Sequence, residues 1–136
     1  MEINKLYSIA ESEGVTVDFI NIPVAKAMAL KLYGKTFLAI DKDVRSGSAE
    51  ERVLLAHELG HIQTDSCHGL SSPNSARRLC ERQADRWAIK ALVPFGELLK
   101  AYKNGNETVQ ALAETFGVTE EFMQKALEFY CYRTYA

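Results

Sequence analysis

Apolar residues recur at intervals of three and four along most of the chain, which is the spacing of helices with one buried face. Residues 3–13 follow this pattern and Gly14 comes directly after them, so a short helix is predicted there. Ser48 and Glu51 have the Ser-x-x-Glu spacing of a capping box, which predicts a helix over residues 49–64. Further helices are predicted from a cap at Asn74 or Ser75 to Leu92, which Pro94 ends, and over residues 95–103, 107–116 and 120–130.

Between residues 15 and 40 the pattern changes to that of strands. This stretch is rich in β-branched and apolar residues, and a turn signal lies at Gly34 and Lys35. Residues 28–33 and 36–40 flank that turn and are predicted to form a hairpin. The fold class that follows is α+β, with a small antiparallel sheet of about three strands packed on a helical core.

The composition is that of one globular domain. The chain has 136 residues, of which 47% are apolar, and its 16 basic and 18 acidic residues leave a net charge of −2. These values exclude a disordered chain and argue against a nucleic-acid partner, which requires a clear excess of basic residues. We expect a single domain over residues 1–136, with a helix and sheet in residues 1–48, two central helices in residues 49–94 and C-terminal helices in residues 95–136.

The chain carries no predicted membrane or secretion signal. No apolar run approaches the roughly 18–20 residues of a membrane span, and the N-terminal residues lack the basic-then-apolar order of a signal peptide. The three cysteines, Cys67, Cys80 and Cys131, form neither a CxxC pair nor a disulfide framework. We therefore expect a soluble cytoplasmic protein with free thiols and no membrane partner.

The strongest chemical signal is the pentapeptide His-Glu-Leu-Gly-His at residues 57–61. Its histidines, His57 and His61, are four residues apart on a predicted helix, so they share one face and can bind a single metal ion. Glu58 lies about 100° around the helix from His57, where a carboxylate can reach a water at the metal without binding the metal. The pattern predicts a Zn²⁺ site with Glu58 as the general base of a hydrolase.

A catalytic zinc ion usually takes a third protein ligand, and three positions are available for it. Asp65 follows His57 by eight residues, about 12 Å along a helix axis, which is too far for both to bind one ion. Cys67 and His68 lie in a predicted loop and could turn back toward the site. Glu81 is the preferred ligand, because the chain after Gly69 has room to reverse and place a second helix antiparallel to the first.

Asp85 follows Glu81 by four residues and therefore shares its helix face. In an antiparallel helix pair, a Glu81 near the metal places Asp85 beside the ring of His57. A carboxylate there can accept the N–H of the ring nitrogen that does not bind the metal, which fixes the tautomer of the histidine. Asp85 is therefore predicted to support His57.

These residues carry a family resemblance. The order His57-Glu58-x-x-His61 followed about twenty residues later by Glu81 and Asp85 resembles the gluzincin arrangement known from thermolysin. The chain more closely resembles the ImmA/IrrE family of metallo-endopeptidases. The stretches that carry this resemblance are Leu55-Ala56-His57-Glu58-Leu59-Gly60-His61-Ile62, Glu81-Arg82-Gln83-Ala84-Asp85-Arg86-Trp87-Ala88, Leu92-Val93-Pro94 and residues 112–118.

The resemblance implies a zincin-like core and a zinc-dependent endopeptidase that acts on a protein or peptide substrate. Some relatives act within bacteria and mobile elements and cleave helix-turn-helix repressors, which implies the same class of substrate here. Two positions depart from the family pattern: many relatives have a histidine where this chain has Asp65, and many have Glu where it has Gln83. Neither position is a predicted ligand, so the predicted metal site does not depend on them.

Two other classes of function are consistent with parts of the pattern. A zinc-stabilised interaction module would use the same ligands to bind a regulator without cutting it, and Glu58 would then be dispensable. Residues 109–127 resemble a helix-turn-helix pair with a glycine at the turn. However, residues 95–136 carry four basic against six acidic residues, a balance that repels DNA phosphates.

The substrate cleft is predicted between the metal-binding helix and an exposed edge of the sheet, where a peptide can add as a strand. Residues 36–40 are the predicted edge strand. Trp87 and Tyr102 could line the cleft, although aromatic residues at helical spacing more often belong to the core. The available donors for the oxyanion of the tetrahedral intermediate are His68, Tyr33, Tyr130 and Tyr132, each of which has an equally ordinary structural interpretation.

Overall fold

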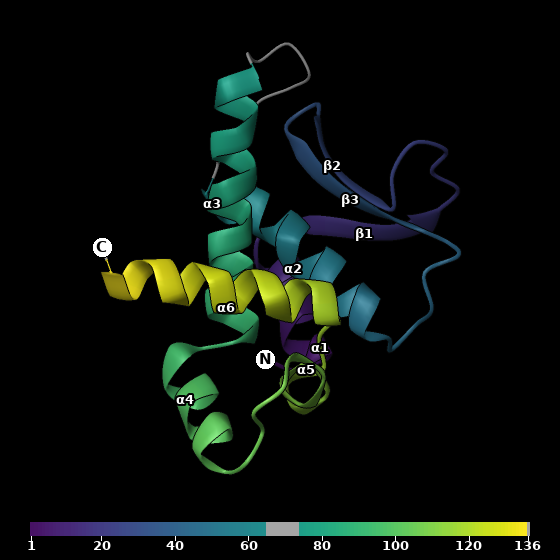
Figure 1. Cartoon of the computed structure of the whole chain (residues 1–136). Helices are drawn as coiled ribbons and strands as arrows, with labels where there is room; N and C mark the ends of the chain where they lie inside the picture. The colour runs from purple at the N-terminus through teal and green to yellow at the C-terminus, as the bar shows by residue number, and fades with distance from the viewer. Residues whose placement is uncertain (65–73, 136) are drawn as a thin grey trace.

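The computed structural model describes residues 1–64 and 74–135. Its elements are α1 (Ile3–Ser12), β1 (Val15–Ile20), β2 (Ala27–Leu32), β3 (Lys35–Asp41), α2 (Ala49–Thr64), α3 (Asn74–Leu92), α4 (Phe95–Lys103), α5 (Val109–Phe116) and α6 (Glu120–Tyr135). Figure 1 shows the strands to one side of α3, with α6 crossing in front of α3 and α4 below it. The predicted α+β class is confirmed.

The helices follow the predicted pattern closely, with differences at two ends. α5 begins at Val109 because Thr108 caps it, its Oγ1 accepting a hydrogen bond of 3.0 Å from the N–H of Ala111. α6 continues past Tyr130 to Tyr135. The other helices begin and end close to the predicted residues. Capping residues and apolar spacing were therefore sufficient to locate them.

The sheet is mixed, so the prediction of an antiparallel sheet is wrong for one of its two strand pairs. The strand order is β1-β3-β2, with β1 parallel and β2 antiparallel to β3. Leu38 and Ile40 of β3 are fully buried, which favours the central position for this strand. The link over residues 21–26 is long enough to cross the roughly 10 Å between β1 and β2, because neighbouring strands lie about 4.8 Å apart.

This strand order also overturns the predicted edge. Residues 36–40 belong to β3, which is hydrogen-bonded to a strand on each side and cannot accept a further strand. The edge strands are β1 and β2. The hairpin itself is confirmed, but its turn lies at Tyr33 and Gly34, whose φ angles of 53° and 76° suit a two-residue turn.

The start of α2 is held by a small buried polar cluster. The Oγ of Ser48 accepts a hydrogen bond of 3.1 Å from the N–H of Glu51, as in a capping box. The Glu51 carboxylate does not return to Ser48, whose own N–H donates to Arg45, but accepts from the N–H of Gly47 and from the Tyr7 hydroxyl. Burial of the Tyr7 hydroxyl and its hydrogen bond to Glu51 raise the pKa of Tyr7 to about 12.

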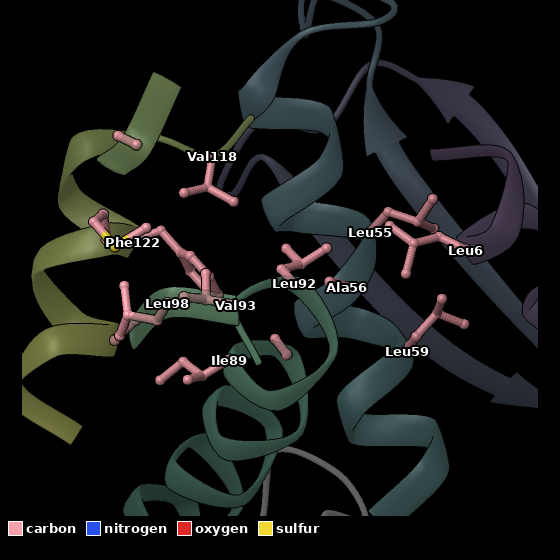
Figure 2. Packing of buried hydrophobic residues seen from close by; sticks show 14 of the residues in the cluster. Leu6, Leu55, Ala56, Leu59, Ile89, Leu92, Val93, Leu98, Val118 and Phe122 are labelled. Carbon is pink, nitrogen blue, oxygen red and sulfur yellow. The ribbon is translucent and has the colours of Figure 1, made fainter. Parts of the chain in front are cut away.

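One apolar core joins the sheet to every helix. Figure 2 shows Leu55 and Leu59 of α2 facing Leu6 of α1, with Ile89 and Leu92 of α3 nearby. Trp87 packs against this cluster, so its predicted alternative role in the core is confirmed. α2 is therefore packed on both flanks, and its polar residues at positions 57, 58 and 61 are held by a rigid support.

α5 and α6 also pack into this core. Leu112 and Met123 are buried, and Gly117 ends α5 with a φ of 66°, a left-handed conformation that favours glycine. The predicted preference for packing over DNA recognition at the helix-turn-helix pair is consistent with this burial. The face of α6 toward α2 brings Lys125 into the vicinity of the metal-binding helices, as described below.

α2 and α3 approach each other most closely at Gly60. A Cβ atom added to Gly60 would lie 2.6 Å from the backbone oxygen of Ala84 and 3.0 Å from its Cα. Backbone atoms cannot move aside as a side-chain end can, so any larger residue at position 60 separates the two helices. Gly60 thereby determines the distance between the helix that carries the histidines and the helix that carries Glu81.

We expect the substitution Gly60→Ala to lower the free energy of unfolding by about 1–3 kcal/mol through overpacking. The matched control is Gly96→Ala in α4, where nothing lies within 4 Å of the added Cβ and no change or a small gain is expected. Urea unfolding of the metal-free protein measures both. Equal stability of the wild type and Gly60→Ala would contradict the close packing of α2 and α3.

Candidate metal centre

His57 and His61 lie one turn apart on α2 and form one side of the centre. Their rings meet edge to face, with centroids 4.8 Å apart and an interplanar angle of 85°. Both rings turn Nε2 toward α3, and both are partly buried. The prediction that the two histidines share one face is confirmed by this contact.

Glu81 of α3 lies opposite both rings. Its Oε2 is 2.9 Å from Nε2 of His57, and its Oε1 is 3.0 Å from Nε2 of His61. The ligand atoms of these three residues all lie within 4.8 Å of one another. The antiparallel arrangement of α2 and α3 therefore brings together the three side chains that the sequence predicts as ligands.

The three side chains fit a zinc ion. Tetrahedral zinc with bonds of about 2.0–2.1 Å holds its ligand atoms about 3.3 Å apart, and the Glu81 oxygens already lie nearly that far from the two rings. Two imidazoles and a carboxylate are also a common donor set of catalytic zinc sites. Only a small outward movement of Glu81, which is exposed, is needed to admit an ion.

Asp85 supports His57 in the predicted way. Its Oδ1 lies 2.8 Å from Nδ1 of His57, while its Oδ2 lies 3.3 Å from Nζ of Lys125 on α6. Burial raises the pKa of Asp85, but the bond to His57 and the charge of Lys125 outweigh burial and lower it. The carboxylate is therefore ionised and can hold the proton of His57 on Nδ1, which leaves Nε2 directed at the metal position.

The pKa values of the two histidines are shifted in opposite directions. Burial lowers the pKa of His57, but the hydrogen bond to Asp85 and the nearby carboxylates outweigh burial, and the pKa is raised. Burial lowers the pKa of His61, and the neighbouring His57 lowers it further. A neutral imidazole is the form that binds a metal, so the lowered pKa of His61 favours binding. A protonated His57 would release the proton of Nε2 on binding an ion and keep that of Nδ1 toward Asp85.

Glu58 lies beside this group without belonging to it. The residue is 9% exposed, and burial raises its pKa to about 7, with Glu81 adding to the increase and His57 opposing it. A carboxyl group that titrates near neutral pH can accept a proton and later return it. These properties suit the predicted role of Glu58 as a general base.

Sequence reasoning missed Lys125. It lies 40 positions after Asp85, and no local motif marks it, because only the packing of α6 brings its ammonium group to the carboxylate. Asp85, His57 and Lys125 also line a cavity of about 360 Å³, whose apolar wall includes Val53 and Phe122. The centre therefore has an adjoining hollow that is larger than a single side chain.

Several predicted alternatives lie elsewhere. Asp65, Cys67 and His68 are outside the described residues, as is the side chain of Tyr132. Tyr33 is exposed at the hairpin turn, Tyr102 lies in an apolar groove on α4, and the Tyr130 hydroxyl donates a hydrogen bond of 2.7 Å to the backbone oxygen of Val93. The oxyanion donor therefore stays a prediction without an assigned residue.

The contact between Asp85 and His57 leads to a prediction about metal affinity. The substitution Asp85→Asn removes the charge that holds the His57 proton, so zinc affinity is expected to fall about 10- to 100-fold. The control is Glu121→Gln, which changes an acid of the same cavity that touches none of the three ligands. Competition with a chromophoric chelator measures both affinities, and an unchanged affinity in Asp85→Asn would contradict the supporting role.

Comparisons with known proteins agree with this geometry. The sequence profile of the Peptidase_M78 family, described as the IrrE N-terminal-like domain, matches residues 10–128. No curated protein matches the sequence significantly. The matched range includes the three proposed ligands, Glu58 and Asp85.

In the described part of the chain, no helix has the length and hydropathy needed to cross a membrane.

Proposed function

The chain belongs to the Peptidase_M78 family, and on that premise we propose that it is a zinc-dependent endopeptidase with His57, His61 and Glu81 as metal ligands. The observation that carries the proposal is the convergence of two imidazoles and one carboxylate on a single point beside a buried glutamate. A zinc ion at that point supplies Lewis acidity to the water and to the scissile carbonyl.

The chain itself supplies the proton transfers. Glu58 accepts a proton from the attacking water and later delivers it to the nitrogen of the leaving amine. Burial raises the pKa of Glu58 to about 7 in the metal-free protein. A bound metal ion would lower this pKa and so favour the carboxylate form that a general base requires.

The remaining polar residues hold the ligands in place. Asp85 keeps the proton of His57 on Nδ1, and Lys125 keeps Asp85 ionised. Gly60 keeps α3 close enough to α2 for Glu81 to reach both rings. These contacts support a preorganised site, in which little rearrangement of the chain is needed before reaction.

We place the substrate along β2. This strand lies at the edge of the sheet and packs against α2, so a peptide added to it would run past the histidines. The cavity beside His57 lies in reach of such a peptide and can take one of its side chains. The proposed cleft therefore uses β2, in place of the strand over residues 36–40.

We further propose that the substrate is a helix-turn-helix repressor, as the resemblance to ImmA/IrrE proteins implies, so that cleavage relieves repression in a bacterial mobile element or stress response. The test incubates the zinc-loaded protein with the repressor encoded beside its gene, with and without a chelator. We expect defined fragments by mass spectrometry only when zinc is present. An intact repressor would contradict this substrate, and failure to cut any unfolded protein or peptide library would contradict the peptidase activity.

A further inference from the structure

Three arginines border the metal centre on its outer side. Arg77, Arg78 and Arg82 line an open hollow on α3 together with Glu81, which is the exposed ligand of the centre. Figure 1 shows the N-terminal half of α3, in teal, extending away from α4, α5 and α6. The hollow is therefore a surface continuous with the proposed active site.

The helix places these arginines within one turn of the ligand. Arg77 and Arg78 precede Glu81 by four and three residues, and side chains at those spacings are neighbours on a helix surface. Arg82 follows Glu81 directly and shares the same hollow. A peptide whose scissile bond lies at the metal has this hollow beside it, because Glu81 belongs both to the hollow and to the centre.

Within the described residues, no acidic side chain neutralises the charge of the three arginines. The Glu81 oxygens face the two imidazoles, and the Asp85 oxygens are taken by His57 and Lys125. Among residues 1–64 and 74–135, no carboxylate forms an ion pair with any of the three guanidinium groups. The acidic residues of α3 are thus committed to the centre, and the surface beside it carries a local positive charge.

We propose that Arg77, Arg78 and Arg82 select substrate segments that carry Asp or Glu close to the scissile bond. This inference rests on the proposed peptidase function. Guanidinium groups bind carboxylates through paired hydrogen bonds, so an acidic side chain is the ligand that this surface fits. A nucleic acid fits less well, because outside these arginines the chain has 13 basic residues against 18 acidic ones, which repel a long phosphate backbone.

The first experiment tests binding without cleavage. Three labelled decapeptides, acidic, neutral and basic, are titrated into the full-length wild type and into an Arg78→Glu/Arg82→Glu variant, both treated with chelator to prevent cleavage. We expect the wild type to bind the acidic peptide about tenfold more tightly than the neutral one at 50 mM salt, and the difference to shrink below about threefold at 0.5 M salt. The variant is expected to lose the preference.

The control is Lys103→Glu, which reverses one exposed positive charge on α4, half the charge change of the double variant, and it is expected to keep the acidic preference. Arg78 and Arg82 are both exposed, so their replacement leaves the core intact. Equal binding of the three peptides by the wild type, or an unchanged preference in the variant, would overturn the proposal. Tighter binding of a single-stranded oligonucleotide that depends on the same arginines would assign the surface to nucleic acid and overturn it as well.

The second experiment uses cleavage of a mixed peptide library by the zinc-loaded protein. We expect Asp and Glu to be enriched within about four residues of the cut sites for the wild type and for Lys103→Glu, but not for the double variant. Absence of any cleavage together with selective binding of the acidic peptide would refute the proposed function while leaving the arginine surface supported. Cleavage without acidic enrichment would refute the arginine surface while leaving the peptidase function supported.

Discussion

Replacing Glu58 by Gln is expected to lower the rate of peptide cleavage by about 10²- to 10⁴-fold while zinc remains bound. The amide has nearly the size of the carboxyl group but cannot accept the proton of the attacking water, and general base catalysis contributes about 10²- to 10⁴-fold to such rates. Glu58 is not one of the three residues that gather around the metal position, so the affinity for zinc should change little. A quenched fluorescent peptide measures the rate, and equilibrium dialysis measures the bound zinc.

The matched control is Glu114→Gln, an exposed residue of α5 away from the centre, which is expected to keep the wild-type rate. The Glu58→Gln variant also separates the two classes of function that the sequence allows. A variant that binds zinc, cuts nothing and yet retains the full biological effect would refute the peptidase and support a zinc-stabilised interaction module. If the protein is an enzyme, we expect the variant to lose both the cleavage of peptides and the biological effect.

Replacing Glu81 by Ala is expected to remove the stabilisation of the fold by zinc. A ligand that binds only the folded protein stabilises it by about 2.7 kcal/mol at 100 times its Kd, which corresponds to a rise in melting temperature of about 10 °C in a domain of this size. Without Glu81, two imidazoles are the ligands that remain at this position among the described residues, so we expect the rise to disappear at the same zinc concentration. Thermal unfolding with and without zinc measures the effect.

The metal-free stability provides the internal control for this variant. The Glu81 side chain is 57% exposed, and among the described residues its carboxylate is paired with the two histidines alone, so its removal should leave the metal-free melting temperature nearly unchanged. Glu114→Ala should respond to zinc as the wild type does. A wild-type rise in melting temperature for Glu81→Ala would show that the third ligand is another residue.

The convergence of the three candidate ligands could be predicted because it depends on local geometry. His57 and His61 are brought together by the spacing of one helix, and Glu81 and Asp85 by the spacing of the next. One further assumption, that the two helices run antiparallel, was enough to assign Asp85 to His57, and the 2.8 Å contact agrees with it. Which side chains lie together within one helical turn can be predicted directly from their spacing in the sequence.

The sheet shows where local pattern is insufficient. The strands over residues 15–20, 27–32 and 35–41 were recognisable from their residues, but their order was not. An alternating or apolar strand looks the same whether it pairs with one neighbour or two, so residues 36–40 were assigned to an edge although they form the centre. Strand order depends on burial against α2, which is a contact between distant segments.

For this protein, the sequence alone determined the α+β class, the helices with their caps, and the residues of one helix face that carry His57, Glu58 and His61. Only the tertiary structure decided which strand lies at the edge, that Lys125 pairs with Asp85, and that three arginines share a hollow with Glu81. The physical reason is that helical spacing acts within a few residues, whereas these features depend on close packing between distant segments, above all where Gly60 meets the backbone of Ala84.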